Sequence, residues 1–180
     1  MPVGARRIAG LRYVTDDRLG EGTVGAFAVA TNFLLKDIGA APFWRRGLEK
    51  PKAINAQAAE HVRSFDIRTP DIQTPVGTLS GGNIQKVLLA RELTGAAEAV
   101  IFAKPTYGLD VKNIRATRQR IRDAADAGKA VLLISTDLDE LLELADRITV
   151  IDRGKLLGAV QNGAGARDAI GRLMSTGEEE

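Results

Sequence analysis

The hydrophobic residues in the second half of the chain come in short runs separated by amphipathic stretches. Short apolar runs predict strands at Ala99–Ala103, which is expected to be buried, at Val131–Ser135 and at Ile148–Ile151. Segments with helical spacing precede and separate them, at Ile84–Leu93, Ile114–Ala127 and Leu138–Ala145. Strands that alternate with helices in this way are typical of parallel α/β construction. The polar segment Asp152–Lys155 then predicts a tight turn into a last strand, Leu156–Val160, as in a hairpin.

The first half is predicted to be mainly helical, with helices at Phe27–Leu35 and Lys52–Phe65. One strand is expected around Leu11, Tyr13 and Val14, whereas Met1–Gly10 is basic and rich in small residues and is not expected to fold. The segment Pro42–Pro51 predicts an exposed connection, in which Trp44 is either a contact residue or a lone surface aromatic.

These changes in pattern divide the chain into four regions. They are a strand and loop at 1–18, a helical region at 19–95, an α/β region at 96–160, and a C-terminal helix with an acidic tail at 161–180. The tail ends in Glu178–Glu180, which is expected to be solvated.

Composition narrows the classes of function. A chain of 180 residues suits one ordinary domain, and the absence of cysteine excludes disulfides and thiolate metal sites. The single histidine, His61, rules out a multi-histidine metal site, and we expect it to be a partly exposed helix residue. A formal net charge of +2 gives no reason to expect a nucleic-acid partner. No apolar run approaches the roughly 18 residues of a membrane span.

The segment Leu79–Val87 carries the candidate chemistry. Ser80 can cap the following helix through its hydroxyl, and Gly81 and Gly82 leave the backbone amides open beside the positive end of the helix dipole. This arrangement suits a phosphate group. The alternative is an ordinary Ser-Gly-Gly loop with a helix cap.

The longer string Leu79-Ser80-Gly81-Gly82-Asn83 resembles the signature motif of the ATPases of ABC transporters, in the form found in sugar and nucleoside importers. Further segments resemble that family in the right order, from about Leu11 to Gly158. They are the Q-loop region at Tyr13–Arg18, the Pro-Thr segment and D-loop at Pro105–Asp110, the switch region at Ser135–Leu141 and Ala145–Ile148, and the closing hairpin at Ile151–Lys155.

The resemblance implies an α/β fold: a partial P-loop NTPase core with parallel strands and an α-helical signature subdomain. In this family two nucleotide-binding domains face each other head to tail. Ser80, Gly81 and Gly82 would then contact the γ-phosphate of ATP held by a partner domain, while Asn83 and Gln85 shape the helix start. The D-loop positions would be Gly108, Leu109 and Asp110, with Asp110 at the dimer seam, and the part around Phe27–Leu35 would lie near the permease.

Other positions depart from the family pattern. No Gly-x-x-x-x-Gly-Lys-Ser/Thr loop is present, so tight binding of ATP by this chain alone is not expected. Ala103 and Lys104 stand where the family has the Asp-Glu pair of the Walker B strand. Thr136 occupies the switch histidine position, and Asp16 replaces the Q-loop glutamine. Lys104 either contacts a phosphate or is solvated or ion-paired.

The parts that serve a partner's site are intact, whereas those of the chain's own site are altered. We therefore expect the C-terminal part of a second, degenerate nucleotide-binding domain of a sugar or nucleoside importer. It would share ATP with Mg²⁺ with a second nucleotide-binding domain, dock on permease subunits at the cytoplasmic side of the inner membrane, hold no metal itself and carry no catalytic residue. The alternatives are a non-catalytic scaffold that binds its partner with or without ATP, and a truncated reading frame without a stable fold.

Overall fold

The computed structural model describes residues 1–176 and divides into two compact units, residues 1–134 and 135–180. Each unit is described by itself. The expected tail at Glu178–Glu180 lies outside the described residues. Among the helices of the described part, none is long and apolar enough to span a bilayer.

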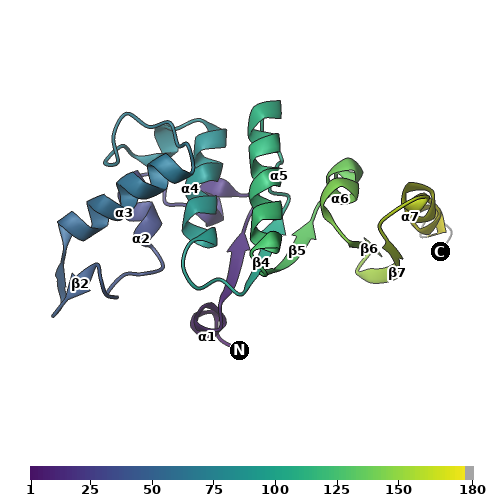
Figure 1. Ribbon diagram of the computed structural model, residues 1–180, viewed down its shortest axis with the longest axis horizontal. Helices are drawn as coiled ribbons and strands as arrows, with labels where there is room; N and C mark the ends of the chain where they lie inside the picture. The colour runs from purple at the N-terminus through teal and green to yellow at the C-terminus, as the bar shows by residue number, and fades with distance from the viewer. Residues whose placement is uncertain (177–180) are drawn as a thin grey trace. The chain divides into compact units, whose positions relative to one another are not determined.

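The first unit contains a parallel three-stranded sheet in the order β1-β4-β5, which Figure 1 shows beside α5. Its strands are β1 (Leu11–Val14), β4 (Ala99–Ala103) and β5 (Ala130–Ile134). Central β4 buries Val100 and Phe102, which alternate along the strand and so point to the same face. The outer strand β5 leaves Leu132 and Ile134 exposed. The sequence pattern thus predicted β1 and β4, and it placed β5 one residue too late.

Two long helices precede and follow the central strand β4 in the chain. Helix α4 (Gly81–Leu93) buries residues around most of its circumference, including Val87, Leu88 and Leu89, and contacts β1. Helix α5 (Val111–Asp126) connects β4 to β5. Both helices begin three residues before the predicted starts, because the polar residues ahead of the apolar stretches form their first turns.

The helical part of the first unit consists of α2 (Val29–Leu34) and α3 (Pro51–Ser64), packed against each other and against α4. The expectation for His61 was wrong, because its ring is buried. It packs edge-on against Phe33 and Phe65, with ring centroids 5.0 and 6.5 Å away. Desolvation by this burial lowers the pKa of His61, and nearby Glu60 partly opposes the shift.

Several short elements were not predicted. Residues Val3–Ile8 form helix α1, although this stretch buries no side chain. Arg18–Gly22 forms a single π-helical turn, and Val76–Thr78 a 3₁₀ turn ahead of the signature segment. The expected connection at Pro42–Pro51 contains an antiparallel pair, β2 (Trp44–Arg45) and β3 (Leu48–Glu49), and buries Phe43.

The second unit consists of α6 (Leu138–Leu144), an antiparallel pair β6 (Arg147–Asp152) and β7 (Lys155–Gln161), and α7 (Ala166–Thr176), which packs on the pair. The predicted hairpin is confirmed. Arg153 and Gly154, with φ values of 45° and 80°, form its turn, as a two-residue hairpin loop requires. Within this unit β6 pairs antiparallel with β7.

Candidate functional site

The signature turn, residues 80–83, opens α4. Ser80 has an extended backbone, and its carbonyl accepts hydrogen bonds from the amides of Asn83 and Ile84, at 2.8 and 3.0 Å. The prediction that the Ser80 hydroxyl caps the helix is wrong, because no side-chain cap bond forms. Asn83 Nδ2 instead donates to Ser80 Oγ at 2.9 Å, so the hydroxyl is held by a side chain and not by a backbone amide.

The two glycines of the turn have different surroundings. Gly81 is exposed, and the heavy atom nearest to the position of an added Cβ is Arg18 Nη1, at 3.9 Å. Gly82 is buried, and a Cβ there would collide with the side-chain amide of Asn113. Gly82 is therefore needed for packing, whereas Gly81 leaves open surface in front of the helix start.

Asn83 and Gln85 fix the first turn of α4 to other segments. Asn83 Oδ1 accepts from the amide of Arg68 at 2.8 Å, and Gln85 Oε1 accepts from Arg18 Nε at 2.8 Å. Gln85 is fully buried, and its Nε2 has no partner within the part of the chain that the structure describes. These contacts are consistent with the expectation that both residues shape the helix start.

The segment 105–110 runs from the end of β4 to α5. Its backbone folds back through bonds from Tyr107 N to Lys104 O and from Leu109 N to Thr106 O, both 3.1 Å, and Gly108 has a φ of 67°. Asp110 caps α5: its Oδ1 accepts from Asn113 N at 2.9 Å and its Oδ2 from Asn113 Nδ2 at 2.7 Å. The backbone bond from Asn113 and then its side-chain bond lower the pKa of the Asp110 carboxyl.

The altered positions Asp16 and Lys104 lie side by side. Lys104 follows Ala103 at the end of β4 with a φ of 43°, and its amide donates to Ile134 O at 2.7 Å. Lys104 Nζ forms an ion pair with Asp16 Oδ2 at 3.8 Å. The sequence left Lys104 as either a phosphate contact or a solvated or ion-paired side chain, and in the structure it is ion-paired.

These residues do not fit a magnesium ion. The only carboxylate among the three altered positions of this unit, that of Asp16, faces an ammonium group, and Ala103 offers no ligand oxygen in its side chain. No group of three acidic or histidine side chains that could hold a metal exists among residues 1–176.

Thr136 belongs to the second unit, in the turn before α6, and it is exposed. The residues on either side of Thr136 are hydrogen-bonded. Ser135 Oγ donates to Glu140 Oε2 at 2.7 Å, and Asp137 caps α6 by accepting from Glu140 N at 3.1 Å.

Two residues of the site were missed in the sequence. Arg18 bonds to Gln85 and also donates to the carbonyl of Tyr107, and Asn113 lies between Asp110 and Gly82. The spacing of Asp110 and Asn113, three residues apart before a helix, is a capping pattern that indicates the second of these roles. No sequence signal identifies the partners of Arg18.

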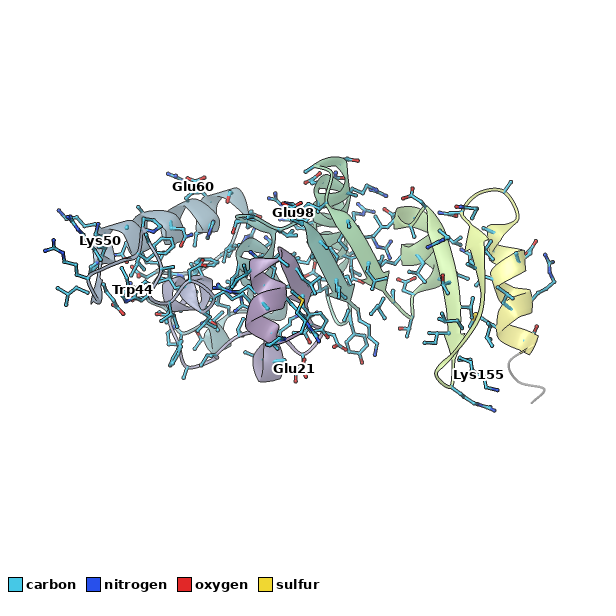
Figure 2. The ribbon with its side chains drawn as sticks, turned by 90° about the horizontal axis from the view of Figure 1, so that it is seen from below. Glu21, Trp44, Lys50, Glu60, Glu98 and Lys155 are labelled. Atoms are coloured by element: carbon cyan, nitrogen blue, oxygen red, sulfur yellow. The ribbon has the colours of Figure 1, made fainter. Side chains whose placement is uncertain are left out.

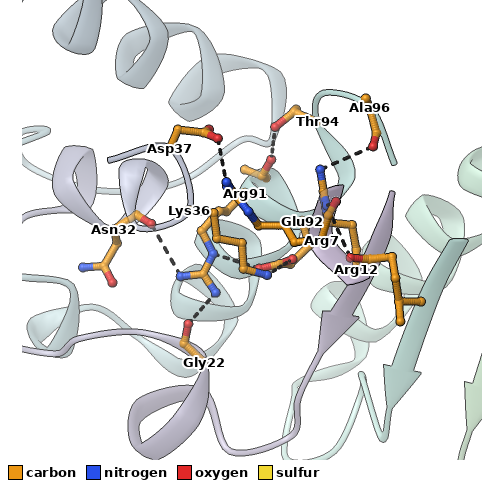
Figure 3. Close-up of polar contacts among 12 residues, drawn as sticks. Arg7, Arg12, Gly22, Asn32, Lys36, Asp37, Arg91, Glu92, Thr94 and Ala96 are labelled. Atoms are coloured by element: carbon orange, nitrogen blue, oxygen red, sulfur yellow. Dashed lines mark hydrogen bonds and ion pairs between the residues drawn. The ribbon is translucent and has the colours of Figure 1, made fainter. Parts of the chain in front are cut away.

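A buried charge cluster stabilises the far end of α4 (Figure 3). Glu92 is fully buried and forms ion pairs with Lys36 and Arg91, and Arg91 Nη2 also donates to the carbonyl of Gly22 at 2.6 Å. Desolvation lowers the pKa of Lys36, which the charge of Glu92 partly offsets. The cluster joins α4 to the end of α2 and to the turn that begins at Arg18.

The helical part also carries a cavity of about 340 Å³. Its lining includes Leu34 of α2, Trp44 of the β2–β3 pair and Ile54 of α3. Figure 2 shows Trp44 near Lys50, which follows β3. Trp44 is half-buried, so the prediction that it is an exposed residue is only partly right. Exposed Ile38 lies at the same cavity.

Comparison with known sequences gives close relatives among import proteins. The chain is 35% identical over 167 residues to the guanosine import ATP-binding protein NupO of Bacillus subtilis (strain 168) and 38% identical over 165 residues to the nucleoside import ATP-binding protein NupA of Lactococcus lactis subsp. cremoris (strain MG1363). It is 33% identical over 167 residues to a ribose import ATP-binding protein, RbsA 2, of Rhizobium etli. These alignments cover 92–93% of the chain, which spans about a third of the length of each relative. No protein-family model matches.

Comparison with solved structures identifies the fold. The dimeric ATP-binding cassette MJ0796, in a post-hydrolysis state bound to ADP and Pi, matches with a TM-score of 0.69 over 86% of this chain and 63% of its own, at 20% identity. The ADP conformation of MJ1267, a cassette of an ABC transporter, matches with a TM-score of 0.72 over 98% and 71%, at 16% identity. Over nearly its whole length the chain is therefore similar to ATP-binding proteins of nucleoside and sugar import, and its fold is that of the ATP-binding cassettes of ABC transporters.

Proposed function

We propose that this chain is part of the ATP-binding component of a nucleoside or sugar importer and that it serves ATP held by a partner cassette. The observation that carries the proposal is an asymmetry. The signature turn presents an open glycine, Gly81, at the start of a well-packed helix, whereas Lys104 and Asp16 are paired with each other. The chain is therefore equipped to complete a partner's site and poorly equipped to build its own.

The signature turn would bind the γ-phosphate of the partner's ATP. The open amides at Gly81 and the hydroxyl of Ser80 would donate to phosphate oxygens, with the positive end of the α4 dipole behind them. The ionised carboxylate of Asp110 would face the partner beside them. ATP hydrolysis would use the partner's own base and Mg²⁺, and this chain would contribute positioning and charge stabilisation.

The helical part would dock on permease subunits and so hold the chain at the cytoplasmic face of the membrane. The support for this step is the cavity beside α2, where Trp44, Leu34 and exposed Ile38 offer apolar surface. This surface suits an inserted apolar side chain of a short permease helix.

The test is Gly81→Asp in the importer assembled from this protein, its partner cassette and its permease. A carboxylate in the open space in front of the helix start would repel phosphate, and we expect ATPase activity and transport to fall on the order of 100-fold or more. The matched control is Gly171→Asp, because Gly171 also has open space around its Cβ position but lies in α7, outside the candidate site. ATPase activity that is equal in Gly81→Asp and Gly171→Asp would refute the proposal.

A second candidate function is a scaffold that binds a partner cassette or permease without handling nucleotide. The pairing of Lys104 with Asp16 favours it, because the charges that the chain would offer a nucleotide of its own are already matched. The same preparations distinguish the two: a scaffold binds its partner equally well with and without ATP, whereas a signature donor binds more tightly with ATP.

A further inference from the structure

The two segments that this chain would turn toward a partner come from different elements. The signature turn, residues 80–83, opens α4, and the segment 105–110 connects β4 to α5. Nothing in the chain connectivity holds them together, because β4 and the end of α4 lie between them. The structure nevertheless links them by side chains at two points.

The first link is Arg18, which lies between the two segments. Its Nε donates to Gln85 Oε1 in the first turns of α4 at 2.8 Å, and its Nη2 donates to the carbonyl of Tyr107. Its Nη1 is the heavy atom nearest to the position of a Cβ on Gly81. One guanidinium group therefore lies against the signature turn and bonds to the segment 105–110 at the same time.

The backbone of Arg18 is itself held in place. Asp17 Oδ1 accepts from Gly20 N at 2.8 Å at the start of the π-helical turn, and Thr23 Oγ1 donates to the carbonyl of Arg18 at 2.7 Å. The buried charge cluster fixes the end of this turn, because Arg91 donates to the carbonyl of Gly22. These bonds hold the backbone from which the Arg18 side chain extends.

The second link is Asn113. Its amide nitrogen donates to Asp110 Oδ2 at 2.7 Å, and its side chain fills the space that a Cβ on Gly82 would need. The two glycines of the turn are therefore backed by two polar side chains, one that bonds to the carbonyl of Tyr107 and one that bonds to Asp110. Both links use atoms of the same two segments.

The chemistry of these bonds requires arginine. Burial lowers the pKa of Arg18, and the charge of Asp16 opposes this shift. The planar guanidinium remains charged and donates along two directions at once, and its charged bonds are stronger than neutral ones. A lysine has a single donor centre on a flexible stem and cannot make the bonds to Gln85 and Tyr107 together in this geometry.

We propose that Arg18 is a positioning residue that locks the signature turn and the segment 105–110 into one register, so that a partner meets them as a single surface. The expected effect on the importer rests on the proposed function, whereas the bonds from Arg18 to Gln85 and Tyr107 are a property of this chain. Gln85 takes part in the lock as the acceptor on α4. Among the described residues the Nε2 of Gln85 has no partner, so the bond from Arg18 to its Oε1 is the polar contact that this buried amide makes.

A distance measurement tests the lock directly. The protein contains no cysteine in this chain, so Thr78→Cys and Lys112→Cys, both at exposed positions, place one spin label before the signature turn and one at the start of α5. We expect a narrow distance distribution in the parent and a broader or displaced one in Arg18→Lys. Arg115→Lys is the matched control, an exposed arginine on α5, and should keep the parent distribution.

A kinetic measurement in the assembled importer separates positioning from a merely structural role. We expect Arg18→Lys to lower kcat for ATP hydrolysis by tenfold or more, since small misplacement of a contact group costs on the order of 100-fold. Its thermal unfolding midpoint should stay close to that of Arg115→Lys. If Arg18→Lys fails to fold, Gln85→Met replaces it, because this change removes the acceptor and an unpaired buried amide at once.

An unchanged distance distribution, or a broadened one with unchanged kcat, would overturn the inference. A wild-type importer without ATPase activity, or a harmless Gly81→Asp, would instead refute the proposed function and leave the distance measurement as the test of the lock. The two failures are therefore distinguishable.

Discussion

Gly82 and Asn113 show how one atom decides the local arrangement of the site. The side-chain amide of Asn113 lies where a Cβ on Gly82 would be, and the same amide holds Asp110 at the cap of α5. A glycine that resembles a phosphate-binding residue in the sequence is therefore also a packing residue. Gly81, which has open space, is the better position for testing contact with phosphate.

His61 gives a prediction at the same scale. Burial lowers its pKa in the folded chain, while the unfolded chain retains an ordinary value near 6.5. Between the folded and unfolded pKa values, the unfolded state binds more protons, so the free energy of unfolding falls as the pH falls through about 6.5. We expect a larger loss of stability from about pH 7.5 to about pH 5.5 in the parent than in His61→Gln.

Urea unfolding at both pH values measures this difference. The comparison uses the change with pH and not the absolute stability, because His61→Gln also removes the ring contacts with Phe33 and Phe65. Parallel losses in the two proteins would mean that His61 titrates alike in the folded and unfolded states.

At the scale of elements, the end of α4 combines buried apolar side chains with the buried charge cluster. Glu92 has two cationic partners and no exposed surface, so removing its charge leaves Lys36 and Arg91 facing each other. We expect Glu92→Gln to lower the free energy of unfolding by about 3–5 kcal/mol. Glu60→Gln, which removes an exposed pair with Arg63, should cost less than about 1 kcal/mol.

Chemical denaturation of both variants checks this prediction. Equal costs for Glu92→Gln and Glu60→Gln would show that the cluster contributes no more than a surface ion pair. A selective loss would also be expected to loosen the turn that carries Arg18, because Arg91 holds the carbonyl of Gly22.

For the whole molecule, the sequence pattern predicts elements better than their partners. The apolar runs identify β4 and β5 because strands of parallel sheets consist of continuous hydrophobic residues, although only β4 is buried here. The same kind of run identifies β6, and the polar segment Asp152–Lys155 after it predicts the antiparallel pairing of β6 with β7. The burial of His61 and the bonds of Arg18 also depend on long-range contacts, because Gln85 and Tyr107 are far from Arg18 in the sequence.

The departures at Asp16, Ala103 and Lys104 could be identified by comparison with the family motif, whereas the ion pair between Asp16 and Lys104 required the fold.

The exposed outer side of β5 has a consequence for how the chain behaves in solution. In the described sheet β5 is bonded on one side only, to β4, and it exposes Leu132 and Ile134. An unprotected apolar edge is a template for strand addition by another copy, and so it favours aggregation. We expect this chain, handled alone, to self-associate as its concentration rises, and Leu132→Lys to suppress the association. Sedimentation velocity over a concentration series measures it, with Leu156→Lys on the exposed hairpin as control. Equal association in the parent, Leu132→Lys and Leu156→Lys would mean that another surface mediates self-association.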